Sequence, residues 1–477
     1  MNVIQTIINV FKVKELRDKI LFTIAMLAVY RIGFWIPIPG VDQSQLSEFF
    51  ARSVGEGNAL SRIAGHMAIF SGGALGQSTI FGLGVMPYIS AAIIFQILGG
   101  VLEPLKRLKE EGPTGQQKIQ EYTRYTTVAL CIVQAIAWLS YVRSMNFVYV
   151  EWASNPLWWV MAVTAMTAGT VFLMWIGEQI DRFGIGNGVS MIITAGILTG
   201  MPGAVLTVWQ NFEPGGDPTK IGWLGLLSIV GMFVLVVAGS VVMTVAQRRI
   251  PVQQAKHTRG RRVFGGQKSY LPLRVNHGGV MPIIFASSLM IIPSTVFGGI
   301  NDSLSGPGVT DGVVDGVFDA DFWRGVMTWM SDAFLMGAFP YVLLYIVMVF
   351  FFSYFWITVQ FNPEEMSKQL RDHGSFIPGL RPGPRTAEYL ETVMERITYV
   401  GAAFLSVIAV MPMVINSALN IDYSVTQFLG GTGLLIVVSV TLDFLQRVEA
   451  NLLMRNYAGF LGGQDDGKAP KLRGPRY

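Results

Sequence analysis

Two stretches, Gly84–Ser90 (GVMPYIS) and Gly279–Phe285 (GVMPIIF), share the pattern Gly-Val-Met-Pro-x-Ile, and each opens an apolar run. The proline of each stretch lacks a backbone N–H and clashes with the preceding turn, so it predicts the start or a kink of a helix. Matching irregular helices in two halves of a membrane protein indicate an internal repeat beside the functional cavity. A chance match is the alternative, because Gly and Pro are common in membrane helices.

The composition is that of an integral membrane protein. The 477 residues are 51% hydrophobic and only 14% charged, whereas a soluble chain carries about 25% charged residues. The first apolar run lacks a small-residue cleavage site, so no cleavable signal is expected. The single cysteine, Cys131, lies in an apolar run, and the four histidines show no metal-ligand spacing. We therefore expect no disulfide, metal or cofactor.

Ten apolar runs of about 17–25 residues are each long enough to cross a bilayer as a helix. They predict an all-α polytopic membrane protein whose termini lie on the same side. The runs cover residues 20–38, 80–99, 124–143, 158–177, 189–209, 222–245, 279–298, 336–358, 398–417 and 428–446.

The distribution of positive charge predicts the orientation. The N-terminus, the loops after the second, fourth, sixth and eighth runs, and the C-terminus together carry 29 of the 35 Lys and Arg residues. Because Lys and Arg accumulate on the cytoplasmic side, both termini are predicted to be cytoplasmic. Apart from Arg31, the runs contain Asp, Glu, Lys, Arg or His only near their ends, which argues against an ion-coupled pump.

Two long cytoplasmic segments, 247–276 and 360–396, are candidate docking surfaces. The first holds eight basic residues and no acidic residue. Lys and Arg side chains at the ends of these loops suit binding to a phosphate backbone or to an acidic protein. The alternative is that they only determine the membrane topology.

On the other side of the membrane, residues 58–79 are too polar to span. They predict either a short re-entrant helix that lines a cavity or an ordinary external loop.

Branched aliphatic residues beside the Pro motifs are candidates for a seal. Val85 and Ile89, and likewise Val189 and Ile193, are four residues apart and therefore share a helix face. Ile284 occupies the place of Ile89 in the second copy. A ring of such side chains around a narrow waist excludes water and ions by dewetting. Simple packing against other helices is the alternative, and the spacing alone favours it.

Taken together, the motifs resemble the SecY family of bacterial protein-conducting channels. The likeness covers nearly all of the chain, with motifs in the expected order: TIFGLGVMPYISAAIIFQ, FLMWIGEQI, GIGNGVSMIITAGI, QRRIPVQQAKHTRGRRV, LPLRVNHGGVMPIIFASS, FNPEEMSKQL and FIPGLRPG. The resemblance implies two pseudo-symmetric inverted halves, residues 1–210 and 211–477, around an hourglass pore. It also implies that the protein is a channel and not an enzyme. Such a channel passes unfolded secretory polypeptides across the cytoplasmic (inner) membrane and releases membrane-protein segments sideways into lipid.

The same resemblance implies roles for individual residues. The pore ring maps onto Val85, Ile89, Val189, Ile193, Ile284 and Ile436. The plug that closes the external funnel lies within 58–79 and includes Ile69, Phe70, Ser71, Gly72 and Gly73. The polar lining of a lateral gate maps onto Gln96, Ser287 and Ser288. The docking residues are Arg248, Arg249, Lys256, Arg261, Arg262, Arg371 and Arg381.

The expected partners also follow from the resemblance. They are small SecE-like and SecG-like membrane subunits, the motor ATPase SecA, the ribosome with its RNA and proteins, signal sequences, nascent polypeptides and the lipid bilayer. Pro251 and Pro384 depart from the family pattern and are expected to stiffen the basic loops. The competing hypothesis, an inverted-repeat secondary transporter, needs fixed polar or ionisable groups at the midplane. The apolar runs lack such ionisable groups, which favours the channel.

Overall fold

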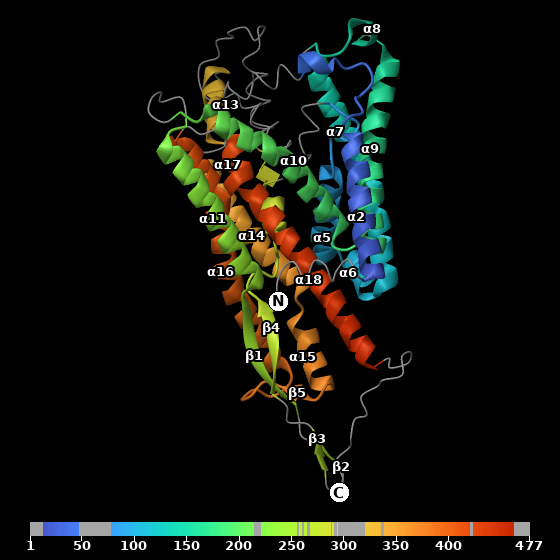
Figure 1. Cartoon of the computed structure of the whole chain (residues 1–477), viewed down its shortest axis with the longest axis vertical. Helices are drawn as coiled ribbons and strands as arrows, with labels where there is room; N and C mark the ends of the chain where they lie inside the picture. The colour runs from blue at the N-terminus through green and yellow to red at the C-terminus, as the bar shows by residue number, and fades with distance from the viewer. Residues whose placement is uncertain are drawn as a thin grey trace.

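The computed structural model describes residues 13–46, 78–144, 146–153, 155–213, 221–254, 257–259, 262–264, 268–287, 289–290, 293, 320–334, 338–419 and 423–461. These residues form long helices in two groups that stand side by side, with a small β-structure at one end (Figure 1). In that view most helices of the first half of the chain lie on the right, and most of the second half lie on the left. The predominantly helical architecture predicted from the apolar runs is confirmed.

The described helices of the first half overlap the first five predicted spans. In chain order they are α2 (Lys14–Gly33), α5 (Met86–Val101), α6 (Glu103–Glu110), α7 (Pro113–Ser144), α8 (Val150–Ala153), α9 (Pro156–Phe183) and α10 (Gly188–Asn211). The short polar helix α6 is bent by 99° against α5. It therefore turns away from the axis of the second span.

The helices of the second half overlap the remaining spans except for the seventh. They are α11 (Trp223–Val245), α13 (Ala320–Ala333), α14 (Phe339–Gln360), α15 (Pro363–Asp372), α16 (Pro384–Leu419), α17 (Tyr423–Gly430) and α18 (Thr432–Leu461). Span 279–298 is described only in part, and its residues 281–287 are helical. Within the described ranges, five helices are long and apolar enough to cross a membrane, or six if α5 and α6 form one span. The number ten stays a prediction.

Asparagine and proline mark where several of these helices begin. Asn155 accepts a hydrogen bond from the backbone N–H of Leu157 at 3.0 Å, and Pro156 follows it as the first helical residue. Asn362 and Pro363 repeat this arrangement at the start of α15. The asparagine satisfies one free backbone N–H of the first turn, and the proline has none to leave free.

The two basic segments, predicted to be cytoplasmic loops, contain strands, which corrects their interpretation as loops. The strands are β1 (Gln247–Gln254), β2 (His257–Arg259), β3 (Arg262–Phe264), β4 (Lys268–Arg274) and β5 (Ser375–Phe376). β4, β1 and β5 form an antiparallel sheet in that order, and β2 pairs with β3 in a separate hairpin. Pro251 lies inside β1 opposite Tyr270. The alternation of buried Ile250 and Val252 with exposed Arg249 and Pro251 is that of a half-buried strand.

Three hydrophobic clusters hold the helices and the sheet together. The central cluster contains side chains from both GVMP stretches and from α2, α9, α10, α11, α14, α16 and α18. A second cluster packs α7 against α9 within the first half. The third joins the sheet to α14, α15 and α16. The two copies of the repeat therefore meet in the middle of the molecule.

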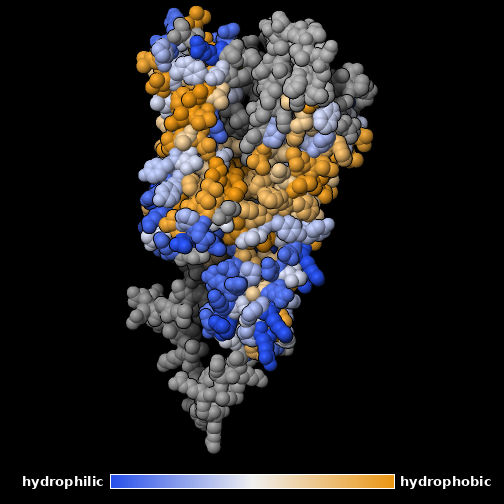
Figure 2. Space-filling view, turned by 180° about the vertical axis from the view of Figure 1, so that it is seen from behind, coloured by the Kyte–Doolittle hydropathy of each residue, from blue (hydrophilic) through white to orange (hydrophobic). Residues whose placement is uncertain are grey.

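The outward faces of the helices are also apolar. On α11, Leu224, Leu227, Val234 and Val242 are each more than half exposed. Figure 2 shows hydrophobic surface across the middle of the molecule and hydrophilic surface toward the end that carries the sheet. A helix that is apolar on its outer face as well as its inner face is typical of a membrane span. The chain is thus a multi-pass membrane protein.

The beginning of α2 and the later part of α18 lie at the same end of the molecule. Leu16 and Ile20 of α2 pack in one cluster with Val448 of α18 and with Ile185. Arg274, at the end of β4, donates to Gln446 of α18 at 3.1 Å, so this is also the end that carries the sheet. The predicted even number of spans places the two ends of the chain on the same side of the membrane, and this packing agrees with it.

Candidate functional site

The two GVMP stretches share one backbone conformation. Gly84 and Gly279 have φ values of 57° and 58°, in the left-handed region that glycine enters without steric cost. The backbone hydrogen bond from the shared Ile of each stretch to its Val, four residues earlier, is also present in both copies. The N–H of Ile89 donates to Val85 at 3.0 Å, and the N–H of Ile284 donates to Val280 at 3.2 Å. Pro87 lies in the first two positions of α5, so the prediction that these prolines start helices is confirmed for this copy.

All six residues of the predicted pore ring lie in the central hydrophobic cluster. Five of them are buried and Val189 is partly buried against them; the five are Val85, Ile89, Ile193, Ile284 and Ile436. The six come from the start of α5, from α10, from the helical residues 281–287 and from α18. The structure thus places branched aliphatic side chains from both halves in contact with a common core.

Val280 and Val440 are among the members of this cluster that sequence reasoning missed. Val280 and Val440 are each 8% exposed and belong to the same core. Val280 is the counterpart of Val85 in the second copy, so the repeat itself contained the signal that identifies it. Val440 lies one helical turn after Ile436 on α18, and only the packing of α18 reveals it.

A close approach of backbones positions α10. Gly188, the last glycine of GIGNG, lies against the carbonyl of Gly177 on α9, where any Cβ atom would collide with backbone. Asn187 caps the helix, because its side chain accepts from the N–H of Ser190 at 3.1 Å. The glycine-rich stretch therefore serves to start α10 tightly against α9, and this orients Val189 and Ile193.

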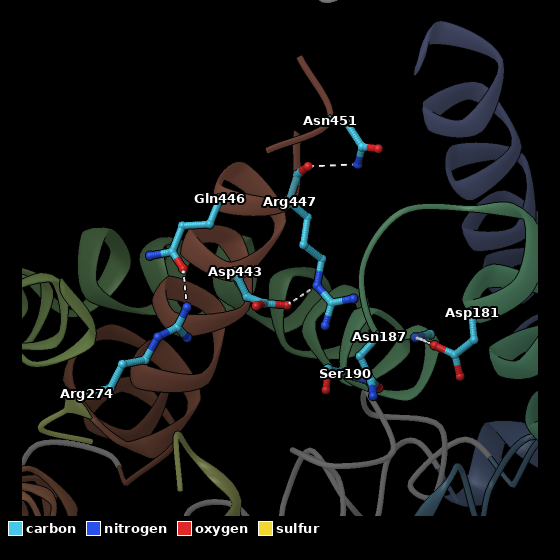
Figure 3. A network of polar contacts seen from close by, with 9 residues as sticks. Asp181, Asn187, Ser190, Arg274, Asp443, Gln446, Arg447 and Asn451 are labelled. Carbon is cyan, nitrogen blue, oxygen red and sulfur yellow. Dashed lines mark hydrogen bonds and ion pairs between the residues drawn. The ribbon is translucent and has the colours of Figure 1, made fainter. Parts of the chain in front are cut away.

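Polar side chains from the end of α9, the start of α10, the end of β4 and α18 lie near one another (Figure 3), at the end of the molecule that carries the sheet. A cavity of about 190 Å³ lies between α10, the end of β4, the GVMP turn and α18, and Val280 and Val440 form part of its wall. Its polar lining includes Asn187, Asn276 and Ser439. A vestibule with several polar side chains in its wall thus adjoins an apolar core.

Charged residues around this vestibule are paired. Arg447 donates to Asp443 at 2.8 Å, one turn apart on α18. The N–H of Gly188 donates to Asp181 at 2.7 Å. His277, which also lines the cavity, has its pKa lowered by burial and by the positive charge of Arg274. The imidazole is therefore held in its neutral form.

The candidate docking residues that the structure describes lie on the β-structure and beside it. Arg248 and Arg249 of β1, Arg371 of α15 and Arg381 are all exposed. The buried core of the sheet supports them from below, through Ile250, Val252, Leu273, Leu390 and Met394. Lys256 and Arg261 lie outside the described residues, and the side chain of Arg262 does as well. The basic segment is thus a folded projection whose core anchors it to α14 and α16.

The plug and lateral-gate predictions are described only in part. Residues Ile69–Gly73 lie outside the described residues, and so does Ser288. Gln96 is half-buried on α5. Ser287 is buried, and its hydroxyl donates to the carbonyl of Ile284 in its own helix at 3.0 Å. These roles stay predictions.

The comparisons identify the family. The SecY family model matches residues 79–445. The chain belongs to the SecY family. It is 38% identical to protein translocase subunit SecY of Chlamydia trachomatis over 473 residues, which cover 96% of this chain and 98% of the relative. It is 37% identical to the subunit of the same name of Thermotoga maritima over 469 residues, which cover 98% and 99%.

Solved structures of the same fold agree with this membership. One described as a protein conducting channel matches with a TM-score of 0.57 and 17% identity, over 94% of this chain and 95% of the other. Sec61 in the canine ribosome-channel complex matches with a TM-score of 0.53 over the same shares. The curated relatives are protein translocase subunits, so the chain is a protein-conducting channel and not an enzyme, and the alternative of an inverted-repeat secondary transporter is not favoured.

Proposed function

We propose that this chain is a passive conduit for unfolded polypeptides, sealed at its waist by the ring of Val85, Ile89, Val189, Ile193, Ile284 and Ile436. The observation that carries the proposal is the meeting of these side chains, from both copies of the repeat, in one apolar cluster beside a polar vestibule. Water between such side chains gains few hydrogen bonds, so the closed waist excludes ions. A polypeptide that enters replaces contacts between ring residues with contacts to itself.

The driving force comes from a partner that docks on the cytoplasmic β-structure. Exposed arginines on β1 and α15 and Arg381 offer planar donors to carboxylates or phosphates. The motor ATPase SecA and the ribosome are the proposed partners. One structural neighbour is Sec61 in a ribosome-channel complex, and this supports the second partner. Small SecE-like and SecG-like membrane subunits complete the proposed complex.

Lateral release into lipid is the second part of the proposal. The lateral gate lies between the second and third spans on one side and the seventh and eighth on the other, with Gln96, Ser287 and Ser288 as its lining. An apolar signal sequence leaves this gap for the bilayer because burial of its side chains in hydrocarbon is favourable. Residues 58–79, including Ile69–Gly73, form the plug on the external side.

The proposed topology has both termini in the cytoplasm of a bacterial cell and the chain in the inner membrane. The excess of Lys and Arg at the sheet end supports this orientation. The packing of Leu16 with Val448 supports a common side for the two ends of the chain. The two halves, 1–210 and 211–477, are proposed as the units that move against each other.

A crosslinking experiment tests the conduit. Cys131 is replaced by Ser, Ile193 by Cys, and an arrested secretory precursor carries its own single cysteine. We expect disulfides to Ile193→Cys that follow the position of the precursor cysteine along its chain. A cysteine at exposed Leu198, on the same helix, is the matched control and should not crosslink. Intact transport without a crosslink at residue 193 would show that the conduit lies elsewhere.

A further inference from the structure

The two groups of helices leave a loosely packed seam beside α5. The extended packing partners of α5 are α6, α7 and α9, whereas those of α14 are α13 and α16. Ile94 of α5 is 39% exposed. Near the end of the same helix, Gly99 and Gly100 border open space, since an added Cβ would meet nothing within 4 Å. Among the described helices, α5 and α14 therefore share no extended contact.

One backbone acceptor in the last turn of α14 has no donor within its own helix. In a continuous helix the carbonyl of Val359 would accept from the N–H four residues later. That residue is Pro363, which has no N–H. The last turn of α14 also contains no basic side chain. The negative end of the α14 dipole is thus left with a free carbonyl and without a cation of its own.

Lys109 supplies both the donor and the charge from the other side. Its Nζ atom donates to the carbonyl oxygen of Val359 at 3.2 Å. Lys109 lies near the end of α6, and the 99° bend between α5 and α6 directs this helix away from the α5 axis. The bond joins residues 250 positions apart in the sequence and links α6 to the end of α14.

We propose that Lys109 is a specificity-determining residue, a latch that sets how apolar a signal segment must be to open the seam. The inference rests on the proposed function. A segment that enters lipid through the seam separates α6 from α14 and breaks this bond. Because Lys109 is exposed, water replaces part of the lost interaction, so the latch adjusts a threshold and does not lock the seam. Strongly apolar segments open it easily, whereas marginal segments are held back.

The test uses the full translocase complex in membrane vesicles and precursors whose signal segments carry a graded number of leucines. Lys109→Met removes the donors and keeps the aliphatic stem, and it should raise transport of the least apolar precursors roughly three- to tenfold. Transport of the most apolar precursor should not change. Lys109→Arg keeps a donor and should behave as the wild type. Lys106→Met, an exposed lysine on the same helix, is the matched control.

A second readout reports the seam directly. In a Cys131→Ser background, Gly100→Cys should react faster with a lipid-soluble maleimide when Lys109→Met is also present. Wild-type selectivity together with unchanged labelling in Lys109→Met would overturn the latch. An equal loss of transport for the most and the least apolar precursors in Lys109→Met would also overturn the latch, because Lys109 would then affect transport without affecting selectivity. If the wild type transported no precursor at all, the proposed function would fail, and this result is distinct from both others.

Discussion

Arg124 and Glu178 tie two helices of the first half together, because the Nε of Arg124 on α7 donates to Oε1 of Glu178 on α9 at 2.7 Å. The two side chains are 36% and 26% exposed, so the pair is intermediate between a surface and a buried ion pair. Replacement of Glu178 by Gln keeps the shape and removes the charge. We expect a loss of about 1 kcal/mol in the free energy of unfolding.

Thermal unfolding of the purified protein in detergent measures this loss as a lower Tm. Arg182→Gln is the control, since Arg182 is exposed at the end of the same helix. An unchanged Tm in Glu178→Gln would mean that the ion pair contributes nothing to stability.

The equivalent glycines of the two GVMP stretches should respond alike to substitution. Gly84→Ala and Gly279→Ala each place a Cβ on a residue with φ near 60°, at a cost of roughly 1–2 kcal/mol. Gly279 has no neighbour within 4 Å of the added Cβ, so its penalty is one of backbone conformation alone. Gly99→Ala is the contrasting variant, because this helical glycine also borders open space and Ala favours the helix. The Tm of Gly99→Ala should rise above that of the wild type, whereas the Tm values of Gly84→Ala and Gly279→Ala should fall.

If the pore ring seals the channel, a polar substitution in the ring should let ions pass. Ile436 is 1% exposed within the central cluster, and Ile436→Asn introduces donors and acceptors that hold water at the waist. Ion conductance of the reconstituted complex in planar bilayers should therefore rise several-fold over the wild type. Leu445→Asn, on the exposed face of the same helix, should not change the conductance. Equal conductance of Ile436→Asn and the wild type would remove Ile436 from the seal.

Charge reversal at the docking surface should uncouple the motor without unfolding the channel. Arg381 is exposed beside the sheet, so Arg381→Glu replaces a donor for acidic or phosphate groups with a repulsive charge. We expect motor-driven export into vesicles to fall at least tenfold at an unchanged Tm. Arg182→Glu reverses an exposed charge in the first half and should export normally. Normal export by well-expressed Arg381→Glu would contradict the docking role.

His277 predicts a dependence of stability on pH. Burial lowers its pKa below the ordinary value of 6.5, so the unfolded chain binds a proton more readily than the folded chain does. This difference has no effect above pH 6.5, and it reduces stability as the pH falls from 6.5 through the folded pKa. His277→Gln should therefore lose less Tm than the wild type between pH 7.5 and 5.5. His373→Gln is the control, because His373 is exposed.

The long helices could be predicted well from the sequence, whereas the β-structure of the basic segments could not. Spans such as 158–177 and 222–245 coincide closely with the observed α9 and α11 and need no knowledge of their neighbours, because hydrocarbon requires a long apolar helix. In β1 the alternation of Ile250 and Val252 with polar residues was present, but Pro251 was interpreted as a feature of a loop. β1 is the middle strand, but β5 pairs only with Gln253 and Gln254, so among the described strands Pro251 has a neighbour on one side only, as at a sheet edge.

The sequence by itself determined the membrane class, the doubled GVMP motif and the family resemblance, because hydropathy and consecutive identities are local properties of the chain. Only the tertiary structure decided which of many i, i+4 aliphatic pairs converge. It brought Val280 and Val440 into the cluster with Ile89 and Ile436. It also set Lys109 against the carbonyl that Pro363 leaves free. Such contacts depend on how distant helices pack, and no periodicity within one helix specifies a partner 250 residues away.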